Sequence, residues 1–411
     1  MDSPIITTTG LLQEMTKIGR VKKRDVDKFS IFNTLILSDR TTHKTLQKQL
    51  QIRPNSISKY IDELIEVGLV SKESATGEGN RGRPVTYLSM NKDRLVALTI
   101  TIHSRTLTLR LINSTSEVLA EHRLSIPYDI TNEGMNRILD DNISRLIDST
   151  PLTYPLCGMV FSLPGWVDQK KKLWGRTARF EHISDLDFSH YEDRYGVEVS
   201  VRPIHDTVLN YHIRNDDRFS KGSVVMLSWG WRIINGLGID GKVFHHIERQ
   251  FGHIGHNIVN LGPTAKQCNC GSFGCLETEA SQWALLEELR HHLGDVPADE
   301  IAFAHFIEQC DVSNLECIDN ALNYIVVALV NLSRMFYSDH IILTGAFIHN
   351  PWICEQVMKR WNDATQHIST PWPNLTLSLS AHYESEVGSV YPIFEKTIRR
   401  LIDVNDGVKI K

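Results

Sequence analysis

The apolar residues in the first quarter of the chain are spaced like those of short amphipathic helices. They recur at three- and four-residue intervals between positions 26 and 36, which predicts a first helix that ends near Ser38. Thr42 can cap a second helix, and after a break at 51–54 a third apolar stripe predicts another helix. The apolar positions of the three helices are Val26, Phe29, Phe32, Leu35, Ile36, Leu46, Leu50, Ile57, Ile61 and Leu64.

The third predicted helix carries short polar side chains on the side opposite its apolar stripe. A helix pair in which the second helix has such a polar first half is typical of a helix-turn-helix that reads base edges in the major groove. We therefore expect four residues to contact DNA: Asn55, Ser56, Ser58 and Lys59. The alternative is a three-helix packing or oligomerisation module.

Two short β-rich runs follow the helices, at 69–70 and 85–88, and a glycine-rich loop over 74–84 joins them. A β-hairpin after a helix-turn-helix is the wing of a winged helix. Arg81 and Arg83 lie in this loop and are candidates for contact with phosphate or a narrow minor groove. The alternative is a surface loop with two solvated arginines.

From about residue 93 the pattern changes to β-rich runs that alternate with longer amphipathic segments. Runs at 95–112 and 223–228 read as strands, whereas 138–149 and 318–336 read as helices. This alternation predicts an α/β body of two sheet-based lobes with a cleft between them. We thus divide the chain into a winged helix-turn-helix domain, residues 1–92, and a two-lobed body, residues 93–411.

Charge is distributed unevenly over these two parts. The chain has 411 residues and a net charge of −5, but residues 1–92 carry a net +5 and the remainder a net −10. A basic head on an acidic body is consistent with a nucleic-acid binder that has a separate sensing part. No apolar run approaches the roughly 18 residues that span a bilayer, and the N-terminus lacks the order of a signal peptide. We expect a cytoplasmic protein without membrane insertion, whose seven cysteines are reduced.

Three of those cysteines lie within eight residues, at Cys268, Cys270 and Cys275. His256 precedes the first of them by 12 positions. Three thiolates and one imidazole make a closed tetrahedral set, which favours one structural zinc per chain over a catalytic zinc. Zinc would fold a loop that has little apolar content of its own. His253 competes with His256 as the fourth ligand.

The segment from Gly252 to Glu277, with its Gly-His-Ile-Gly-His and Cys-Asn-Cys-Gly-Ser-Phe-Gly-Cys-Leu-Glu stretches, resembles the signature of the ROK family of repressors, open reading frames and kinases. With its N-terminal helices the whole chain is similar to the sugar-responsive repressor branch of that family. The resemblance implies an actin-like, hexokinase-type body. It also implies that zinc is bound by His256, Cys268, Cys270 and Cys275, in the motif at 256–275.

Kinases of this family have glycine-rich loops whose backbone amides contact the phosphates of ATP. Here the first such stretch, 99–106, has neither the acid nor a glycine of the kinase motif Asp-x-Gly-Gly-Thr. The second, 230–236, has Trp231, Arg232 and Ile234 where the kinases have small residues. Asp206 matches the kinase base. We expect no enzyme, and the alternative is a ROK sugar kinase with residual ATP-dependent phosphoryl transfer.

The resemblance places an effector pocket at His205, Asp206, His253 and Glu277. His253 replaces a family glutamate and can donate, accept or become charged, so the pocket could prefer a phosphorylated or acidic sugar. Two alternatives are a pocket that binds nothing and control by a phosphotransferase-system protein. The expected partner is a double-stranded DNA operator, bound by a homodimer or a dimer of dimers. A rival interpretation is a zinc-stabilised scaffold whose winged helix binds protein.

Overall fold

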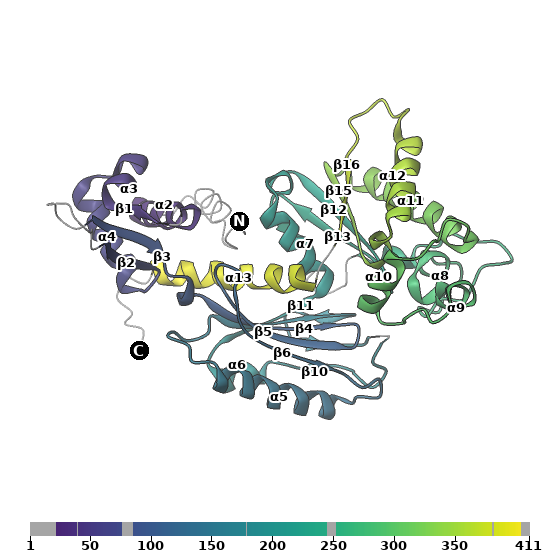
Figure 1. Ribbon diagram of the computed structural model, residues 1–411, viewed down its shortest axis with the longest axis horizontal. Coiled ribbons are helices and arrows are strands. Elements are labelled where there is room, and N and C mark those ends of the chain that lie inside the picture. Colours follow the sequence, from purple (N-terminus) through teal and green to yellow (C-terminus); the bar gives the residue numbers. More distant parts are fainter. Residues whose placement is uncertain are drawn as a thin grey trace.

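Two five-stranded sheets with one shared topology form the body of the protein (Figure 1). The computed structural model describes residues 22–38, 40–75, 85–177, 179–244, 252–379 and 382–403. In each sheet the two strands on one side of the central strand are joined by antiparallel pairing, and the two on the other side are joined by parallel pairing. The expected α/β body with two sheet-based lobes is therefore present.

The first lobe has the strand order β11-β7-β4-β5-β6. Its strands are β4 (Val96–His103), β5 (Thr106–Asn113), β6 (Val118–Ser125), β7 (Gly158–Leu163) and β11 (Glu198–Pro203). Helices α5 (Asn132–Ser149) and α6 (His190–Tyr195) supply apolar side chains to its core, and both lie below the sheet in Figure 1. A small sheet of β8 (Val167–Asp168), β9 (Leu173–Trp174) and β10 (Leu186–Asp187) completes the lobe.

The second lobe has the strand order β14-β13-β12-β15-β16. These strands are β12 (Ser223–Trp229), β13 (Ile233–Ile239), β14 (Lys242–Val243), β15 (His340–Thr344) and β16 (Asn374–Ser378). Successive side chains of β12 point to opposite faces, so Val225 and Leu227 join the larger core while Val224 and Met226 pack near α7 (Ile204–Asn215). The larger core is covered by α8 (Leu276–Ala280), α9 (Gln282–Leu293), α10 (Glu300–Glu308), α11 (Glu316–Phe336) and α12 (Pro351–Thr365).

The head contains the three helices expected from the apolar pattern. They are α2 (Lys23–Leu37), α3 (His43–Leu50) and α4 (Pro54–Glu66). Thr42 caps α3, because its hydroxyl accepts a hydrogen bond from the Thr45 amide at 3.2 Å. The three-stranded antiparallel sheet β1-β3-β2 lies beside the helices, with β1 (Thr41–Thr42), β2 (Val70–Ala75) and β3 (Val85–Met90). Strand β2 is longer than the β-rich run predicted at 69–70.

The C-terminal helix α13 (His382–Asp403) passes from the junction of the two lobes to the head (Figure 1). Its buried side chains, among them Val390, Phe394 and Leu401, belong to one hydrophobic cluster with residues of α2, α4, β4 and β7. Gly388 lets α13 pack tightly on α7, since a Cβ atom at this position would lie 1.9 Å from the carbonyl oxygen of Thr207. The head and the body thus share a core through this helix.

Among the helices that the structure describes, none combines the length and apolar character needed to cross a bilayer.

Candidate functional site

A cavity of about 320 Å³ lies between the two lobes. The first lobe contributes the β4–β5 turn and Arg179, and the second contributes Trp231, Arg232 and the start of α10. Part of its wall is apolar, from Ile204, Val208, Met226, Ile234, Ile301 and Ala304. A concave site of this size with a few convergent polar groups is suited to a small molecule.

Polar contacts across the cleft join the two lobes at this cavity. The Arg179 guanidinium donates to the Ser104 hydroxyl at 2.9 Å and lies 4.5 Å from the ring centroid of Trp231. The backbone amide of Trp231 donates to the Glu300 carboxylate at 3.1 Å, and the Glu300 amide donates to Ser104 at 3.4 Å. The stretch 99–106, to which Ser104 belongs, thus contacts the opposite lobe.

His103 precedes Ser104, and its Nε2 lies 3.8 Å from a carboxylate oxygen of Glu300. Burial, together with the charge of Arg179, lowers the pKa of His103 to about 4. The imidazole is therefore neutral at physiological pH.

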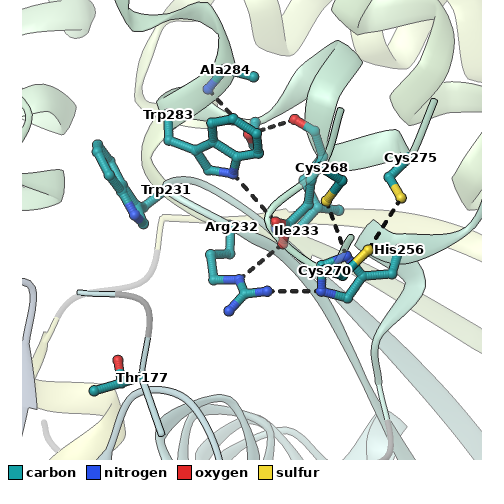
Figure 2. Close-up of polar contacts among 12 residues, drawn as sticks. Thr177, Trp231, Arg232, Ile233, His256, Cys268, Cys270, Cys275, Trp283 and Ala284 are labelled. Carbon is teal, nitrogen blue, oxygen red and sulfur yellow. Dashed lines mark hydrogen bonds and ion pairs between the residues drawn. The ribbon is translucent and has the colours of Figure 1, made fainter. Parts of the chain in front are cut away.

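The expected effector residue Glu277 is held by groups of its own chain. Its side chain is buried, and one carboxylate oxygen accepts from Arg232 Nε at 3.0 Å and from the Ile233 amide at 3.3 Å. The other oxygen accepts from Trp283 Nε1 at 3.3 Å. Figure 2 shows Arg232 directed toward His256, where its Nη2 lies 2.8 Å from the imidazole Nε2.

Of the remaining expected effector residues, His253 lies beside the cysteine loop and His205 lies at the cavity. His205 lines it, and its Nε2 lies 3.4 Å from a carboxylate oxygen of Asp206, the next residue of α7. His253 stacks on His256 with ring centroids 5.7 Å apart. Burial, with smaller effects of His256 and Arg232, lowers the pKa of His253 to about 4. Of the four expected residues, His205 is the one that lines the cavity.

His256, Cys268, Cys270 and Cys275 form a group whose ligand atoms all lie within 4.8 Å of one another. The Sγ atoms of Cys270 and Cys275 are 3.7 Å apart, and His256 Nδ1 is 3.5 Å from the Cys268 Sγ. Zinc–sulfur bonds of about 2.3 Å in a tetrahedron imply sulfur–sulfur separations of about 3.8 Å, so this donor set fits a zinc ion. His253 is not part of the group.

The backbone of the cysteine loop is folded tightly around these side chains. Gly274 has a φ of +68°, and a Cβ atom there would lie 1.7 Å from the carbonyl oxygen of Asn260, so a larger residue does not fit. A metal bound at Nδ1 of His256 leaves the imidazole proton on Nε2. Arg232 also donates at that atom, so metal binding requires this guanidinium to shift.

In the head, the residues expected to contact DNA lie in the first two turns of α4. Asn55, Ser58 and Lys59 are exposed and Ser56 is half-buried, while Ile57 and Ile61 are buried on the opposite side. The Ser58 hydroxyl donates to the backbone carbonyl of Pro54 at 3.0 Å. Arg81 and Arg83 lie outside the described residues.

The sequence reasoning missed the residues that form most of the cavity. Arg179 and Glu300 are in segments without a motif. Besides His205, the sequence signals that point to the cavity wall are Trp231 and Arg232, which are bulky at a position where the family's kinases have small residues.

Comparison with known proteins agrees with this architecture. The model of the ROK family matches residues 98–388. The chain is 26% identical over 245 residues to the DNA-binding transcriptional repressor Mlc of Escherichia coli (strain K12), covering 59% of each protein. It is 22% identical over 339 residues to the xylose repressor of Caldicellulosiruptor bescii, covering 78% of this chain and 83% of that protein.

A solved structure of a ROK family transcriptional regulator, described as a homologue of E. coli Mlc, superposes with a TM-score of 0.70. It is 17% identical and covers 93% of this chain and 99% of that one. At 17% sequence identity, this similarity shows that the two proteins share a fold.

Proposed function

Because the chain belongs to the ROK family, we propose that it is a sequence-specific DNA-binding transcriptional repressor of carbohydrate uptake or catabolism genes. Residues 1–92 would be its winged helix-turn-helix domain, and residues 93–411 the body that senses the effector. Two of its relatives, Mlc and the xylose repressor, are repressors by name.

The observation that carries the proposal is the surface of α4. Its first two turns expose Asn55, Ser58 and Lys59, whose amide, hydroxyl and ammonium groups can contact base edges and phosphates. The nearby carboxylate of Glu63 does not oppose phosphate here, because it is paired with the buried Lys28 at 2.5 Å. This polar, weakly basic surface favours DNA over a protein partner.

We propose that α13 carries the effector signal to the head. At one end, Ser385 lines the cavity and its hydroxyl lies 2.9 Å from that of Ser162 and 2.7 Å from that of Thr207. At the other end, Ile398 and Ile402 pack into the core of the head. A shift of the lobes that moves Ser385 would therefore be transmitted to the DNA-binding helices through a shared core.

The proposed function includes no phosphoryl transfer. The kinases hold the phosphates of ATP with backbone amides of glycine-rich loops. Here Trp231 and Arg232 occupy one such loop, and Ser104 in the other is hydrogen-bonded to Arg179 and Glu300. Asp206, which matches the kinase base, lacks the nucleotide cradle that phosphoryl transfer requires. A residual sugar kinase is the alternative that the assay below must separate.

We propose that the cysteine loop holds one structural zinc ion per chain. Its ligands would be His256, Cys268, Cys270 and Cys275, whose donor atoms already lie within 4.8 Å of one another. When bound, the ion would cross-link the loop to the segment before it and leave no open position for a substrate.

The proposal also includes the oligomeric state of the protein and the molecule that controls its DNA binding. We place the protein in the cytoplasm as a homodimer or a dimer of dimers, which presents two heads to a pseudo-palindromic operator. Its control would come from a sugar, a sugar phosphate or a phosphotransferase-system protein.

Selection of genomic fragments by the full-length protein tests the proposal. We expect enrichment of a two-fold symmetric sequence next to carbohydrate genes. Asn55→Ala should weaken binding to that sequence by about 1–3 kcal/mol, because a base contact is lost. Lys59→Ala should weaken binding to all sequences and lower the salt slope by about 0.9.

Asn362→Ala, in α12 and remote from the head, is the control and should bind DNA like the parent. Failure of the full-length protein to enrich any sequence would refute the proposed function. Sugar-dependent ATP consumption by the same preparation would favour the kinase.

A further inference from the structure

We propose that Asn91, Arg94 and Tyr154 fix the orientation of helix α4 relative to the first lobe, and that this contact sets the separation of operator half-sites that the protein accepts. We call these three residues the α4 clamp. They act at the C-terminal end of α4, away from the DNA-contacting first turns, so they would be positioning residues. The inference rests on the proposed function, since only a DNA-binding dimer reads two half-sites.

Helix α4 ends in a glycine turn that packs against the body. Gly68 has a φ of +80°, and the Leu69 amide donates to the carbonyl oxygen of Leu64 at 2.9 Å, which is the pattern of a Schellman C-cap. A Cβ atom at Gly68 would lie 2.9 Å from the Tyr154 hydroxyl and 3.0 Å from Arg94 Cδ. The end of α4 is therefore in direct contact with both side chains.

Arg94 joins this helix end to Tyr154. It lies in the 3-10 helix η1 (Lys92–Arg94), between β3 of the head and β4 of the first lobe. Its Nε donates to the carbonyl oxygen of Val67 at 2.8 Å, and its guanidinium carbon lies 4.9 Å from the ring centroid of Tyr154. The helix dipole favours a cation at the C-terminal end of a helix, and the face of an aromatic ring attracts a guanidinium. One side chain thus contacts the head and the body.

Asn91 makes a second connection of the same kind. Its backbone amide donates to the carbonyl oxygen of Leu69 at 3.0 Å. Its side-chain Nδ2 donates to the carbonyl oxygen of Gly68 at 2.8 Å and lies 3.4 Å from the Tyr154 hydroxyl. Because this amide nitrogen carries two hydrogens, it can serve both oxygens at once.

The residues on the body side are themselves held by the first lobe. Three positions after Tyr154, the Cys157 amide donates to the carbonyl oxygen of Val96 in β4 at 2.8 Å. In η1, the carbonyl oxygen of Lys92 accepts from the Ser114 hydroxyl at 3.0 Å. The α4 clamp therefore moves with the first lobe, and the connection between head and body is fixed by hydrogen bonds on both sides.

The length of α4 makes its angle important for DNA recognition. Its 13 residues span about 20 Å. A tilt of about 10° at the C-terminal end moves the DNA-contacting end by about 3.5 Å, close to the rise of one base pair. Two heads held at a fixed angle therefore match one separation of half-sites, whereas two loosened heads match several. Because α13 also packs on the head, loss of the α4 clamp should loosen the head without releasing it.

Operators with altered half-site separation test the inference. The sequence selected by the full-length protein is compared with a version that has two extra base pairs between its half-sites. We expect the parent to bind the longer version about tenfold more weakly, since two base pairs rotate one half-site by about 70° relative to the other. Arg94→Ala and Tyr154→Ala should lose much less affinity on this insertion. Their affinity for a single half-site should equal that of the parent, because the α4 surface is unchanged.

Conservative and matched variants separate positioning from stability. Tyr154→Phe keeps the ring that contacts the Arg94 guanidinium and should discriminate between the two operators like the parent. The matched control is Arg194→Ala, because Arg194 lies 5.4 Å from the ring centroid of Tyr195 in a similar contact of the first lobe. It should also discriminate like the parent. A loss of stability alone would weaken binding to both operators equally, and melting temperatures record it.

The orientation of the head is also measured without DNA, by pulsed electron paramagnetic resonance. Spin labels are coupled to p-acetylphenylalanine at two exposed positions, Lys48 of α3 and Arg137 of α5, and labelled chains are diluted in unlabelled chains. We expect a narrow distribution of distances in the parent and a clearly broader one in the double variant Arg94→Ala/Tyr154→Ala.

The inference is overturned if the folded variants discriminate between the operators like the parent, if the parent does not discriminate, or if the distance distribution of the double variant stays as narrow as that of the parent. DNA binding with any of these results refutes the inference and leaves the proposed function standing. A full-length protein that binds no DNA refutes the proposed function and with it the role in half-site separation, and the distance distributions then decide whether the α4 clamp fixes the head.

Discussion

The ammonium group of Lys28 and the carboxylate of Glu63 lie 2.5 Å apart and join α2 to α4, with side-chain exposures of 2% and 14%. Lys28 also donates to the backbone carbonyl of Ile402 in α13 at 3.4 Å. Burial by itself raises the pKa of Glu63, but hydrogen bonding and charge from Lys28 outweigh it and the pKa is lowered. At neutral pH the buried ammonium group of Lys28 therefore connects α2 with α4 and α13.

Replacing this cation tests its importance. Lys28→Met should lower the free energy of unfolding of the head by about 2 kcal/mol, because the half-buried carboxylate of Glu63 is left without its partner. Lys59→Met is the matched control: Lys59 is 69% exposed and lies 4.0 Å from Glu63, so we expect a change below about 1 kcal/mol. Urea denaturation of both variants measures the difference. Equal losses would contradict the assigned pairing.

The pair also predicts a response to acid. Because the folded pKa of Glu63 lies below its ordinary value of 4.5, the stabilisation is present above that pH and is lost as the pH falls through the folded pKa. Lys28→Met should lose less stability than the parent over this interval, as measured by denaturation at pH 6 and below pH 4.

Zinc content distinguishes the two histidines near the cysteine loop. Elemental analysis should find about one zinc per chain, and Cys268→Ser, Cys275→Ser and His256→Ala should each lose it, because the closed four-ligand set is broken. His253→Ala should keep the metal, and so should Cys310→Ser, a cysteine outside the group of donor atoms. Metal-free protein with unchanged stability would refute the site, and loss of zinc in His253→Ala would mean that the ligand is the other histidine.

Kinase activity should be absent. A coupled assay with ATP and a panel of sugars should show no sugar-dependent ADP formation, because positioning of the phosphates supplies most of the rate and both cradles are replaced. Asp206→Asn should leave DNA affinity unchanged, because Asp206 is not among the residues that line the cavity. ATP consumption above background that Asp206→Asn abolishes would restore the kinase interpretation.

Buried histidines predict a loss of stability in weak acid. Burial lowers the pKa of His212, near Ser378 of β16, to about 4. The unfolded chain binds a proton at about pH 6.5, so the stability present above that pH is lost as the pH falls toward 4. Between pH 7.5 and 5.5 we expect a loss of about 1 kcal/mol from this residue. The variant His212→Gln should lack this pH-dependent loss of stability, whereas His182→Gln, a change at an exposed site, should show the same loss as the parent.

Local patterns in the sequence predicted local features of the structure. The stripe of Ile57, Ile61 and Leu64 predicted a helix because residues three and four apart share one helix face. The spacing of Cys268, Cys270 and Cys275, with glycines between them, predicted a tight loop that gathers thiols. The alternation of strands and helices predicted the two α/β lobes. Each of these features depends on residues that lie close together in the sequence.

Contacts between distant segments were decided by the tertiary structure alone. Lys28 and Ile402 are 374 positions apart, and the sequence contains no sign that α13 completes the core of the head. Glu300 meets Ser104 only because the lobes close on one another. The sequence shows that Arg232 is too large for a phosphate loop, but its contact with Glu277 depends on where β13 and α8 lie. Periodicity and spacing report which face of an element is apolar, whereas the partner of a charged side chain is set by the packing of elements that the sequence keeps far apart.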